Sequence, residues 1–343
     1  FGCGFYNARS MITLRMVSWG PGAVDEKTFI DTRIARAVAL RRDVLRLDDV
    51  TDACRLVHAE GDQMPGLIAD RYGPFVVLEF FSKAMYLRVE AIRSAFAAAG
   101  VAPGEFILRA DEDICRQEGF WIKQTAETDR RVIVTENGVK FEVDLTRGHK
   151  TGFFCDQRDN RLALTAFTPG KSVLDLCCYS GGFSCYAATR GKAADVTAVD
   201  IDEVALETAG RNRKLNRVPM QIKQSDVFEF LRNAKRDGKS WDVVIADPSK
   251  FVPNREEMER GMKKYRDLNA LAAGVLRPGG ILLTCSCSGL VSQEQFVDIV
   301  ARAGRFAGRS VQVFRVSGPG GDHPVMADAP QSGYLKAVWA RVE

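Results

Sequence analysis

The sequence predicts an α/β protein in which a doubly wound parallel sheet follows a smaller α+β domain. From Lys171 onward, apolar strand-like runs alternate with helical segments, which is typical of a parallel sheet covered by helices on both faces. Between Arg55 and about Leu145 the runs are short and separated by turns, and only one helix interrupts them. A chain of 343 residues is long enough for two or three domains that each bury a core.

The first fifty residues predict one strand and one connecting helix. The strand covers 11–17, and a Gly20-Pro21-Gly22 break separates it from a helix that begins near Asp25. The predicted apolar face of that helix consists of Phe29, Ile30, Ile34, Ala37 and Val38. The opposite face carries Arg33, Arg36, Arg41 and Arg42, which predicts a surface that faces solvent or phosphate.

The small α+β domain is predicted from short strands at 67–71, 75–81, 106–109 and 119–123, a helix at about 86–99, and a hairpin over 132–143. The hairpin turns at Glu136-Asn137-Gly138, because Asn-Gly supplies the positive φ angles that a tight two-residue turn needs. This segment shows no catalytic constellation.

The larger sheet is predicted from seven strands, at 172–178, 195–200, 220–225, 241–246, 280–285, 311–316 and 334–342. Predicted helices begin after Gly182, cover 203–215, 227–236 and 293–307, and include a long one that ends near 276. Gly318-Pro319-Gly320-Gly321 separates the last two strands, which predicts a terminal hairpin that adds an antiparallel strand.

The composition excludes a membrane protein and indicates which cellular compartment the protein occupies. Hydrophobic residues make up 46% and charged residues 27%, and no apolar run is long enough to span a bilayer. Nine cysteines, several of them in apolar runs, predict reduced thiols and a cytoplasmic protein. The three histidines are scattered, so we expect no metal site. A net charge of +4 is only weak support for a nucleic-acid partner.

Acidic residues and glycines follow the predicted strands, where ligands bind in doubly wound sheets. Asp175, Asp200, Asp226 and Asp247 all fall at strand ends. Gly181 and Gly182 allow the backbone to approach a ligand closely, and Asp200 is placed to accept hydrogen bonds from ribose hydroxyls.

The turn after the first strand favours S-adenosylmethionine (SAM) over a dinucleotide. It reads Cys178-Tyr179-Ser180-Gly181-Gly182 and lacks the G-x-G-x-x-G pattern that seats a pyrophosphate. Asp226, followed by Val227, is placed to meet an adenine edge, although a helix N-cap is an alternative role for it.

Cysteines after the fifth strand suggest covalent catalysis on a pyrimidine. C5 of a pyrimidine is a weak nucleophile until a thiolate adds to C6, and that thiolate needs a cation or a helix N-terminus to lower its pKa from about 8.5. Cys285 and Cys287 lie on the same face of the strand by alternation, so geometry alone does not choose between them. Either can instead be a small apolar filler.

Several motifs together resemble the bacterial large-subunit ribosomal RNA cytosine-C5 methyltransferase I family, over nearly the whole chain. They are Tyr6-Asn7 with Ser10 and Ile12, Asp62-x-x-Pro65-Gly66-Leu67-Ile68-x-Asp70-x-Tyr72-Gly73, the run from His149 to Arg161, Tyr179-Ser180-Gly181-Gly182-Phe183, Asp247-Pro248, Ser286-Cys287-Ser288-Gly289-Leu290, Asp322-His323-Pro324 and Tyr334-Leu335-Lys336.

The resemblance implies a class I (Rossmann-like) methyltransferase domain preceded by a small α+β domain and the tail of an RNA-binding PUA β-domain. The expected boundaries are 1–19 for the PUA tail, 20–48 for a connecting helix, 49–148 for the α+β domain and 149–343 for the methyltransferase domain. Because the chain opens at Phe1 without an initiator Met, we expect the N-terminus to be incomplete.

The resemblance also implies site residues. It places the nucleophile at Cys287, with Asp247 to bind the base or remove the C5 proton and Lys250 to lower the thiol pKa or hold a phosphate. The expected SAM-binding residues are Asp175, Tyr179, Ser180, Gly181, Gly182, Phe183, Asp200, Ile201, Asp226, Val227 and Asp247. The family motif Asp-Pro-Pro-Lys-Phe reads Asp247-Pro248-Ser249-Lys250-Phe251 here, and Ser249 releases a φ angle that proline would fix.

The expected partner is single-stranded or locally unpaired large-subunit ribosomal RNA, without a membrane, and a homodimer is compatible with the sequence. One alternative is methylation of a guanine or an exocyclic nitrogen, in which Cys287 is inert packing. Another is a binding protein, a ribosome-assembly factor with a decayed catalytic domain, which predicts no cofactor binding and tolerance of Asp200→Asn.

Overall fold

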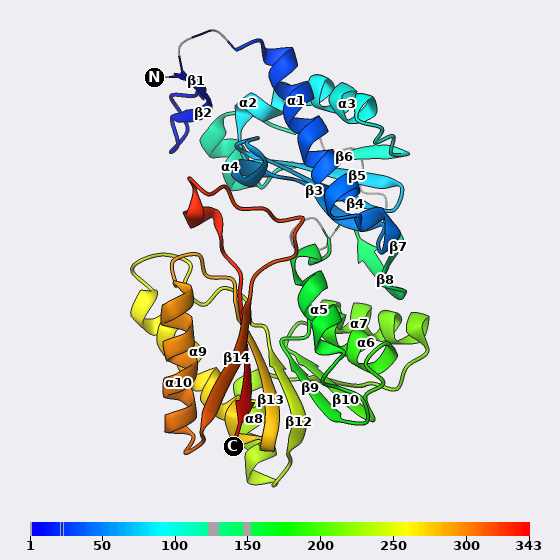
Figure 1. Ribbon diagram of the computed structural model, residues 1–343, viewed down its shortest axis with the longest axis vertical. Coiled ribbons are helices and arrows are strands. Elements are labelled where there is room, and N and C mark those ends of the chain that lie inside the picture. The colour runs from blue at the N-terminus through cyan, green and yellow to red at the C-terminus, as the bar shows by residue number, and fades with distance from the viewer. Residues whose placement is uncertain (1, 21, 23, 123–129, 147–151) are drawn as a thin grey trace. The chain divides into compact units, whose positions relative to one another are not determined.

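The structure is a computed structural model that describes residues 2–20, 22, 24–122, 130–146 and 152–343 (Figure 1). The chain folds into two units. The first comprises Phe1–Gly138, Glu142–Asp156 and Gly320–Ser332, and the second comprises Val139–Phe141, Gln157–Pro319 and Gly333–Glu343.

The second unit is built on a seven-stranded sheet. Its order is β11 (Gln221–Gln224), β10 (Asp195–Asp200), β9 (Ser172–Leu176), β12 (Trp241–Ala246), β13 (Leu276–Ser286), β15 (Lys336–Val342) and β14 (Val311–Ser317). The first five strands are parallel to one another, whereas β15 runs antiparallel to both β13 and β14. The predictions of a doubly wound sheet and of a terminal hairpin with an antiparallel strand are therefore confirmed.

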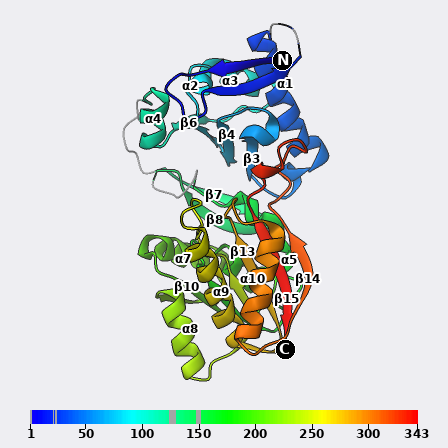
Figure 2. The same ribbon diagram turned by 90° about the vertical axis from the view of Figure 1, so that its left-hand side faces the viewer.

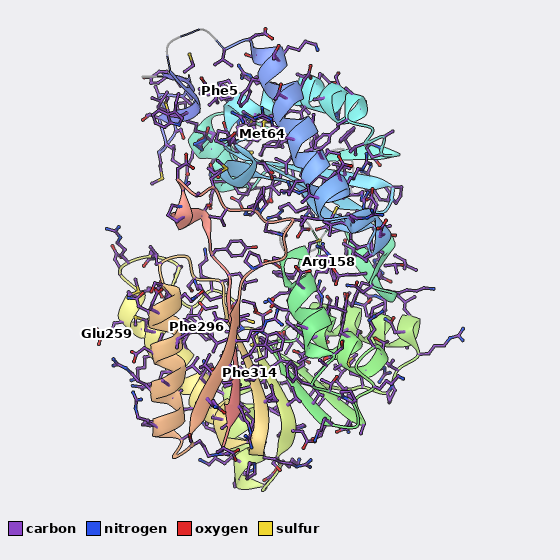
Figure 3. All side chains as sticks on the ribbon, viewed as in Figure 1. Phe5, Met64, Arg158, Glu259, Phe296 and Phe314 are labelled. Carbon is purple, nitrogen blue, oxygen red and sulfur yellow. The ribbon has the colours of Figure 1, made fainter. Side chains whose placement is uncertain are left out.

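Six helices cover this sheet in two groups. On one face α5 (Arg158–Leu164), α6 (Gly182–Thr189) and α7 (Glu203–Asn216) pack side by side, and on the other lie α8 (Val227–Arg236), α9 (Met258–Gly274) and α10 (Gln293–Phe306) (Figures 1 and 2). The second group and the sheet enclose a hydrophobic core to which α9 contributes Tyr265. Helix α10 contributes Phe296 to the same core (Figure 3). Both side chains are fully buried.

The first unit contains a four-stranded sheet and a long helix. The strands β3 (Ala53–His58), β4 (Leu67–Tyr72), β5 (Phe75–Phe80) and β6 (Glu105–Arg109) pair in chain order. The helix α1 (Glu26–Ala39) is capped by Asp25, whose carboxylate accepts the Thr28 N–H at 2.8 Å. The five predicted apolar residues of α1 are all buried, which confirms its predicted face.

The hairpin at Asn137-Gly138 is confirmed, because β7 (Arg131–Glu136) and β8 (Val139–Asp144) pair as a two-stranded sheet and both turn residues have positive φ. Near the N-terminus, β1 (Gly2–Tyr6) pairs with β2 (Leu14–Trp19). The strand expected at 11–17 thus begins later, and β1 was not predicted. The assignment of this region to a PUA domain remains a prediction.

Two elements of the first unit differ from the sequence prediction. No strand forms over the described residues 119–122, where Gly119 ends the unpredicted helix α4 (Glu112–Glu118) with φ +74°. Lys123 lies outside the described residues. In place of the single helix expected at 86–99 there are two, α2 (Lys83–Tyr86) and α3 (Val89–Ala98), separated by Leu87 and Arg88. Helix α2 begins earlier than expected because the Ser82 hydroxyl accepts the Ala84 N–H and caps it.

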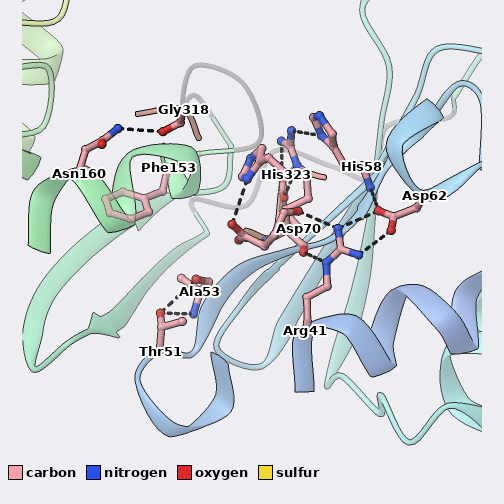
Figure 4. A network of polar contacts seen from close by, with 12 residues as sticks. Arg41, Thr51, Ala53, His58, Asp62, Asp70, Phe153, Asn160, Gly318 and His323 are labelled. Carbon is pink, nitrogen blue, oxygen red and sulfur yellow. Dashed lines mark hydrogen bonds and ion pairs between the residues drawn. The ribbon is translucent and has the colours of Figure 1, made fainter. Parts of the chain in front are cut away.

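Arg41, in the π-helical turn Leu40–Val44 that follows α1, corrects the predicted polar face, because its side chain is buried and not solvated. Nη1 and Nη2 donate to the two carboxylate oxygens of Asp62 at 2.6 and 2.7 Å (Figure 4). The other N–H groups donate to the carbonyl oxygens of Ala37, Arg55 and Asp322. All five donors of the guanidinium are therefore satisfied, the condition under which a buried arginine is tolerated.

The segment Gly320–Ser332, which lies between β14 and β15 in the sequence, belongs to the first unit. The Asp322 carboxylate accepts the Arg55 backbone N–H at 3.0 Å and lies 3.0 Å from His323 Nδ1. Arg55 in turn forms a two-pronged ion pair with Asp70. The connection expected to be a glycine-rich hairpin turn is thus a longer segment that packs into a different unit.

His58 is a neutral histidine of the same cluster. Its Nδ1 lies 3.1 Å from Arg55 Nη1, which can only donate, so Nδ1 carries no proton. Burial, followed by the charge of Arg55, lowers the pKa of His58 to about 2. His58 therefore stays neutral through the neutral range.

All nine cysteines carry free thiols. No helix among the described residues is both long and apolar enough to cross a bilayer, and within the same residues no three His, Cys, Asp or Glu side chains gather as a metal site.

We predict that Arg41→Met lowers the free energy of unfolding by about 3–5 kcal/mol, because it leaves the Asp62 carboxylate buried without its cation. Arg36→Met, at an exposed position near the end of α1, is the matched control and should change it by about 0.5 kcal/mol or less. Urea denaturation monitored by circular dichroism measures both variants. Equal losses in the two variants would contradict a structural role for the buried pair.

Candidate SAM and base site

The candidate site lies where four neighbouring parallel strands end. The strand register aligns Ala246 of β12 with Leu176 of β9 on one side and with Thr284 of β13 on the other. The residues that follow these strands therefore emerge at one edge of the sheet. At this edge the strand order reverses between β9 and β12, which is the topological switch point where ligands bind.

The turn after β9 is held in an unusual backbone conformation. Cys177, Tyr179 and Gly181 have φ angles of +57°, +50° and +78°. Asn212 of α7 donates its side-chain amide to the Ser180 carbonyl at 2.9 Å, which fixes the turn from behind. A side chain at position 181 would meet Ala209 at 3.3 Å, so glycine satisfies both the backbone angle and the space.

Asp200, at the end of β10, supports this turn. One carboxylate oxygen accepts the Tyr179 N–H at 2.8 Å and the other accepts the Asp202 N–H at 3.0 Å. Each carboxylate oxygen has a second lone pair, so the group retains acceptor capacity for ribose hydroxyls. Its contact with a ribose stays a prediction.

Asp175 is a buried carboxylate with one satisfied oxygen. Oδ2 accepts hydrogen bonds from the Ser184 N–H at 3.0 Å and the Ser184 hydroxyl at 2.6 Å, whereas Oδ1 has no partner in the described structure. Burial raises the pKa of Asp175 to about 7; the hydrogen bonds from Ser184 oppose this increase, and the charges of Asp247 and Asp200 add to it. A cation bound near these three acids would favour the ionised carboxylate.

The remaining residues predicted to bind SAM differ in solvent exposure. Phe183 and Val227 are buried, and Ile201 is exposed. Asp226 is the N-cap of α8 and accepts the Glu229 N–H at 3.0 Å. The alternative role considered for Asp226 is thus realised, and its contact with an adenine edge stays a prediction.

Asp247 is oriented by a hydrogen-bonded chain of side chains. Gln157 donates its amide to Asp247 Oδ2 at 3.0 Å and accepts from Asn160 at 2.7 Å. The Ser317 hydroxyl donates to Asn160 Oδ1 at 2.7 Å and accepts from the Trp339 indole at 2.9 Å. In the sequence, Gln157 and Asn160 stood out only as members of the family-motif run from His149 to Arg161, and this chain of hydrogen bonds was not predicted.

Ser288 joins the loop after β12 to the loop after β13. Its hydroxyl accepts the Val252 N–H at 3.1 Å and lies 2.9 Å from the Tyr265 hydroxyl. The Phe251 N–H in turn donates to Tyr265 at 3.4 Å. Tyr265 on α9 therefore holds both loops, a role that the periodicity of α9 did not reveal because it also fits an ordinary core position.

Strand alternation could not distinguish Cys285 from Cys287, but the two differ in burial and in position relative to the end of β13. Cys285 is fully buried inside β13, opposite Ala337 of β15. Cys287 lies one residue beyond the end of β13 and is partly exposed. Lys250 and Ser249 are exposed in the loop after β12. Of the single histidines, His323 is buried in the first unit and His149 lies outside the described residues.

This site defines a class of protein. A sheet of this order, a glycine turn after β9 and an acidic residue ending β10 are features of class I nucleoside-cofactor methyltransferases. The unpartnered oxygen of Asp175 within an acidic cluster fits a cationic ligand such as SAM, which supplies a methyl group on a positively charged sulfur.

A family model for S-adenosylmethionine-dependent methyltransferases matches residues 68–336. The chain is also 37% identical over 352 residues to a Shewanella amazonensis protein named "Ribosomal RNA large subunit methyltransferase I", covering 99% of this chain and 87% of the relative. A Photobacterium profundum protein of the same name is 38% identical, with 97% and 85% covered. The chain belongs to this family of SAM-dependent methyltransferases.

Solved structures share the fold. The protein SMU.776, crystallised with S-adenosylhomocysteine (SAH), has a TM-score of 0.84 at 22% identity and covers 99% of this chain and 88% of its own. A protein from Streptococcus mutans described as a SAM-dependent methyltransferase has a TM-score of 0.83 at 22% identity, with the same coverage.

We predict that binding of SAM near pH 7 releases up to about half a proton. Asp175, with a pKa of about 7, is then about half protonated, and a bound cation lowers its pKa. Isothermal titration calorimetry in two buffers of different ionisation enthalpy measures the release. SAH, whose sulfur is neutral, should release less, and Asp175→Asn should abolish the difference. Equal release with SAM and SAH would contradict the role of Asp175.

Proposed function

We propose that this protein transfers the methyl group of SAM to C5 of a cytosine in large-subunit ribosomal RNA, through a covalent intermediate on Cys287. The observation that carries the chemistry is the partly exposed thiol one residue beyond β13, at the same sheet edge as Asp247 and the cofactor turn. The ribosomal RNA substrate is supported by the names of the relatives described above.

The cysteine makes C5 of cytosine nucleophilic enough to accept a methyl group. The Cys287 thiolate adds to C6, and the electrons of the C5–C6 double bond make C5 nucleophilic. C5 takes the methyl group, so that SAM becomes SAH. A base then removes the C5 proton, the C6–S bond breaks and the double bond is restored. Because C6 must be accessible, the target cytosine is unpaired or flipped out of its stack.

Asp247 has two proposed roles, holding the amino edge of the base or accepting the C5 proton. Its hydrogen bond from Gln157 orients the carboxylate for either role. Cys285, buried opposite Ala337, is proposed to be a packing residue.

The decisive experiment traps the intermediate. Wild type, Cys287→Ala and Cys285→Ala are each incubated in a single turnover with SAM and 5-fluorocytidine-substituted large-subunit ribosomal RNA. Because fluorine at C5 cannot leave as a proton, a denaturant-resistant protein–RNA adduct should accumulate in wild type and in Cys285→Ala, and should be absent in Cys287→Ala. Methyl transfer that persists in Cys287→Ala would instead indicate methylation of a nitrogen.

The same assay separates the two roles of Asp247. The trapped adduct forms before any proton is removed, so Asp247→Asn should form it normally if Asp247 only accepts the C5 proton. Slower adduct formation by Asp247→Asn at saturating SAM would instead assign Asp247 to binding of the base.

A further inference from the structure

Lys336 is a buried lysine beside the proposed nucleophile. It is the first residue of β15 and pairs with Ser286 of β13 across the antiparallel ladder. Its exposed fraction is 7%, which is rare for a lysine. The sequence singled it out only as part of a family motif, without a role.

The Lys336 ammonium binds main-chain carbonyl groups and no acid. Nζ donates to the Ser288 carbonyl at 2.6 Å and to the Tyr334 carbonyl at 2.8 Å. Among the described residues, no carboxylate lies within ion-pair distance of Nζ. An ammonium has three donors, so one remains. A buried positive charge without a counter-ion is costly, which indicates that something other than stability retains it.

The first of these carbonyls belongs to the residue that follows Cys287, so the ammonium ties down the backbone that carries the thiol. Ser288 is also fixed from its side chain by Val252 and Tyr265. Ser288, the residue next to Cys287, is therefore held by β15, the loop after β12 and α9.

The titratable groups whose charges interact with Cys287 come from all three of these elements. Burial lowers the pKa of Lys336 to about 8, while the charge of the Cys287 thiolate raises it and that of Lys250 lowers it. Burial raises the pKa of Tyr265, and the Cys287 charge contributes to that increase. Lys250 is exposed, so water screens its charge, whereas Lys336 acts through a less polarisable interior.

We propose that Lys336 is the positioning residue for Cys287, fixing the backbone beside the thiol and stabilising its thiolate with a buried positive charge. This inference rests on the proposed function, in which Cys287 is the nucleophile. The thiol proton leaves to solvent, and Lys336 stays mostly protonated at pH 7. The resemblance suggested that Lys250 lowers the pKa of the thiol; in this proposal Lys336, more than eighty positions later in the sequence, does so instead.

The test measures the reactivity of the Cys287 thiol without RNA or cofactor. The full chain is alkylated with iodoacetamide between pH 5 and pH 10, and mass spectrometry follows the peptide that contains Cys287. We expect a midpoint below the value of about 8.5 for a free cysteine. Lys336→Gln and Lys336→Met, which remove the charge, should raise the midpoint by about one unit and slow alkylation near pH 7 about tenfold.

Two further variants serve as controls. Lys336→Arg keeps the charge and should keep the midpoint within about 0.3 units of the wild type, and Lys250→Gln should do the same because that lysine is exposed. SAM binding verifies that each variant folds.

An unchanged midpoint in a folded neutral variant would overturn the proposal, as would a shift produced by Lys250→Gln alone. Loss of the fold in both neutral variants would assign Lys336 a structural role and overturn it as well. Because alkylation needs no methyl transfer, these outcomes are independent of adduct formation on 5-fluorocytidine. A shifted midpoint without an adduct would contradict the proposed function and leave the charge effect intact.

Discussion

The shared end-point of β9, β10, β12 and β13 is the constraint on which the candidate site depends. Parallel strands in register must deliver the residues that follow them to one edge of the sheet. Asp200, Asp247 and Cys287 are far apart in the sequence but emerge there together. Since the hydrogen bonds of the sheet fix this arrangement, the site is assembled on a rigid framework.

Polar groups behind that edge determine how each functional side chain is held. Asn212 fixes the turn that contains Gly181, and Gln157 orients Asp247. Ser288 connects the loops that carry Asp247 and Cys287 through Val252 N–H and the Tyr265 hydroxyl. Each interaction pairs a buried polar group, so removing one partner leaves the other unsatisfied at a cost of about 1–3 kcal/mol.

In the first unit, too, buried polar groups are paired with one another, and there the pairs stabilise the fold. Its buried arginines, Arg41 and Arg55, form two-pronged ion pairs with Asp62 and Asp70. Asp322, contributed by a segment near the C-terminus of the chain, completes both arrangements by accepting from Arg55 N–H and offering its carbonyl to Arg41. The first unit therefore requires a part of the chain that follows nearly all of the second unit in sequence.

The sequence by itself determined the periodic elements and the residues at strand ends. The alternation of apolar runs was sufficient for β10, α8 and β12, because strand and helix periods are local properties of the chain. It also brought forward Asp200 and Asp247, since their position at the end of an apolar run is visible without coordinates, whereas the choice of Cys287 over Cys285 came from the family resemblance.

Only the tertiary structure decided which side chains meet. Arg41 has the sequence environment of a surface residue, and its burial follows from Asp62 and Asp322. Cys285 and Cys287 alternate identically, and the end of β13 separates them. Tyr265 and Lys336 both contact Ser288, which is distant from each of them in sequence. Long-range hydrogen bonds and ion pairs leave no periodic trace in the chain, so folding alone defines them.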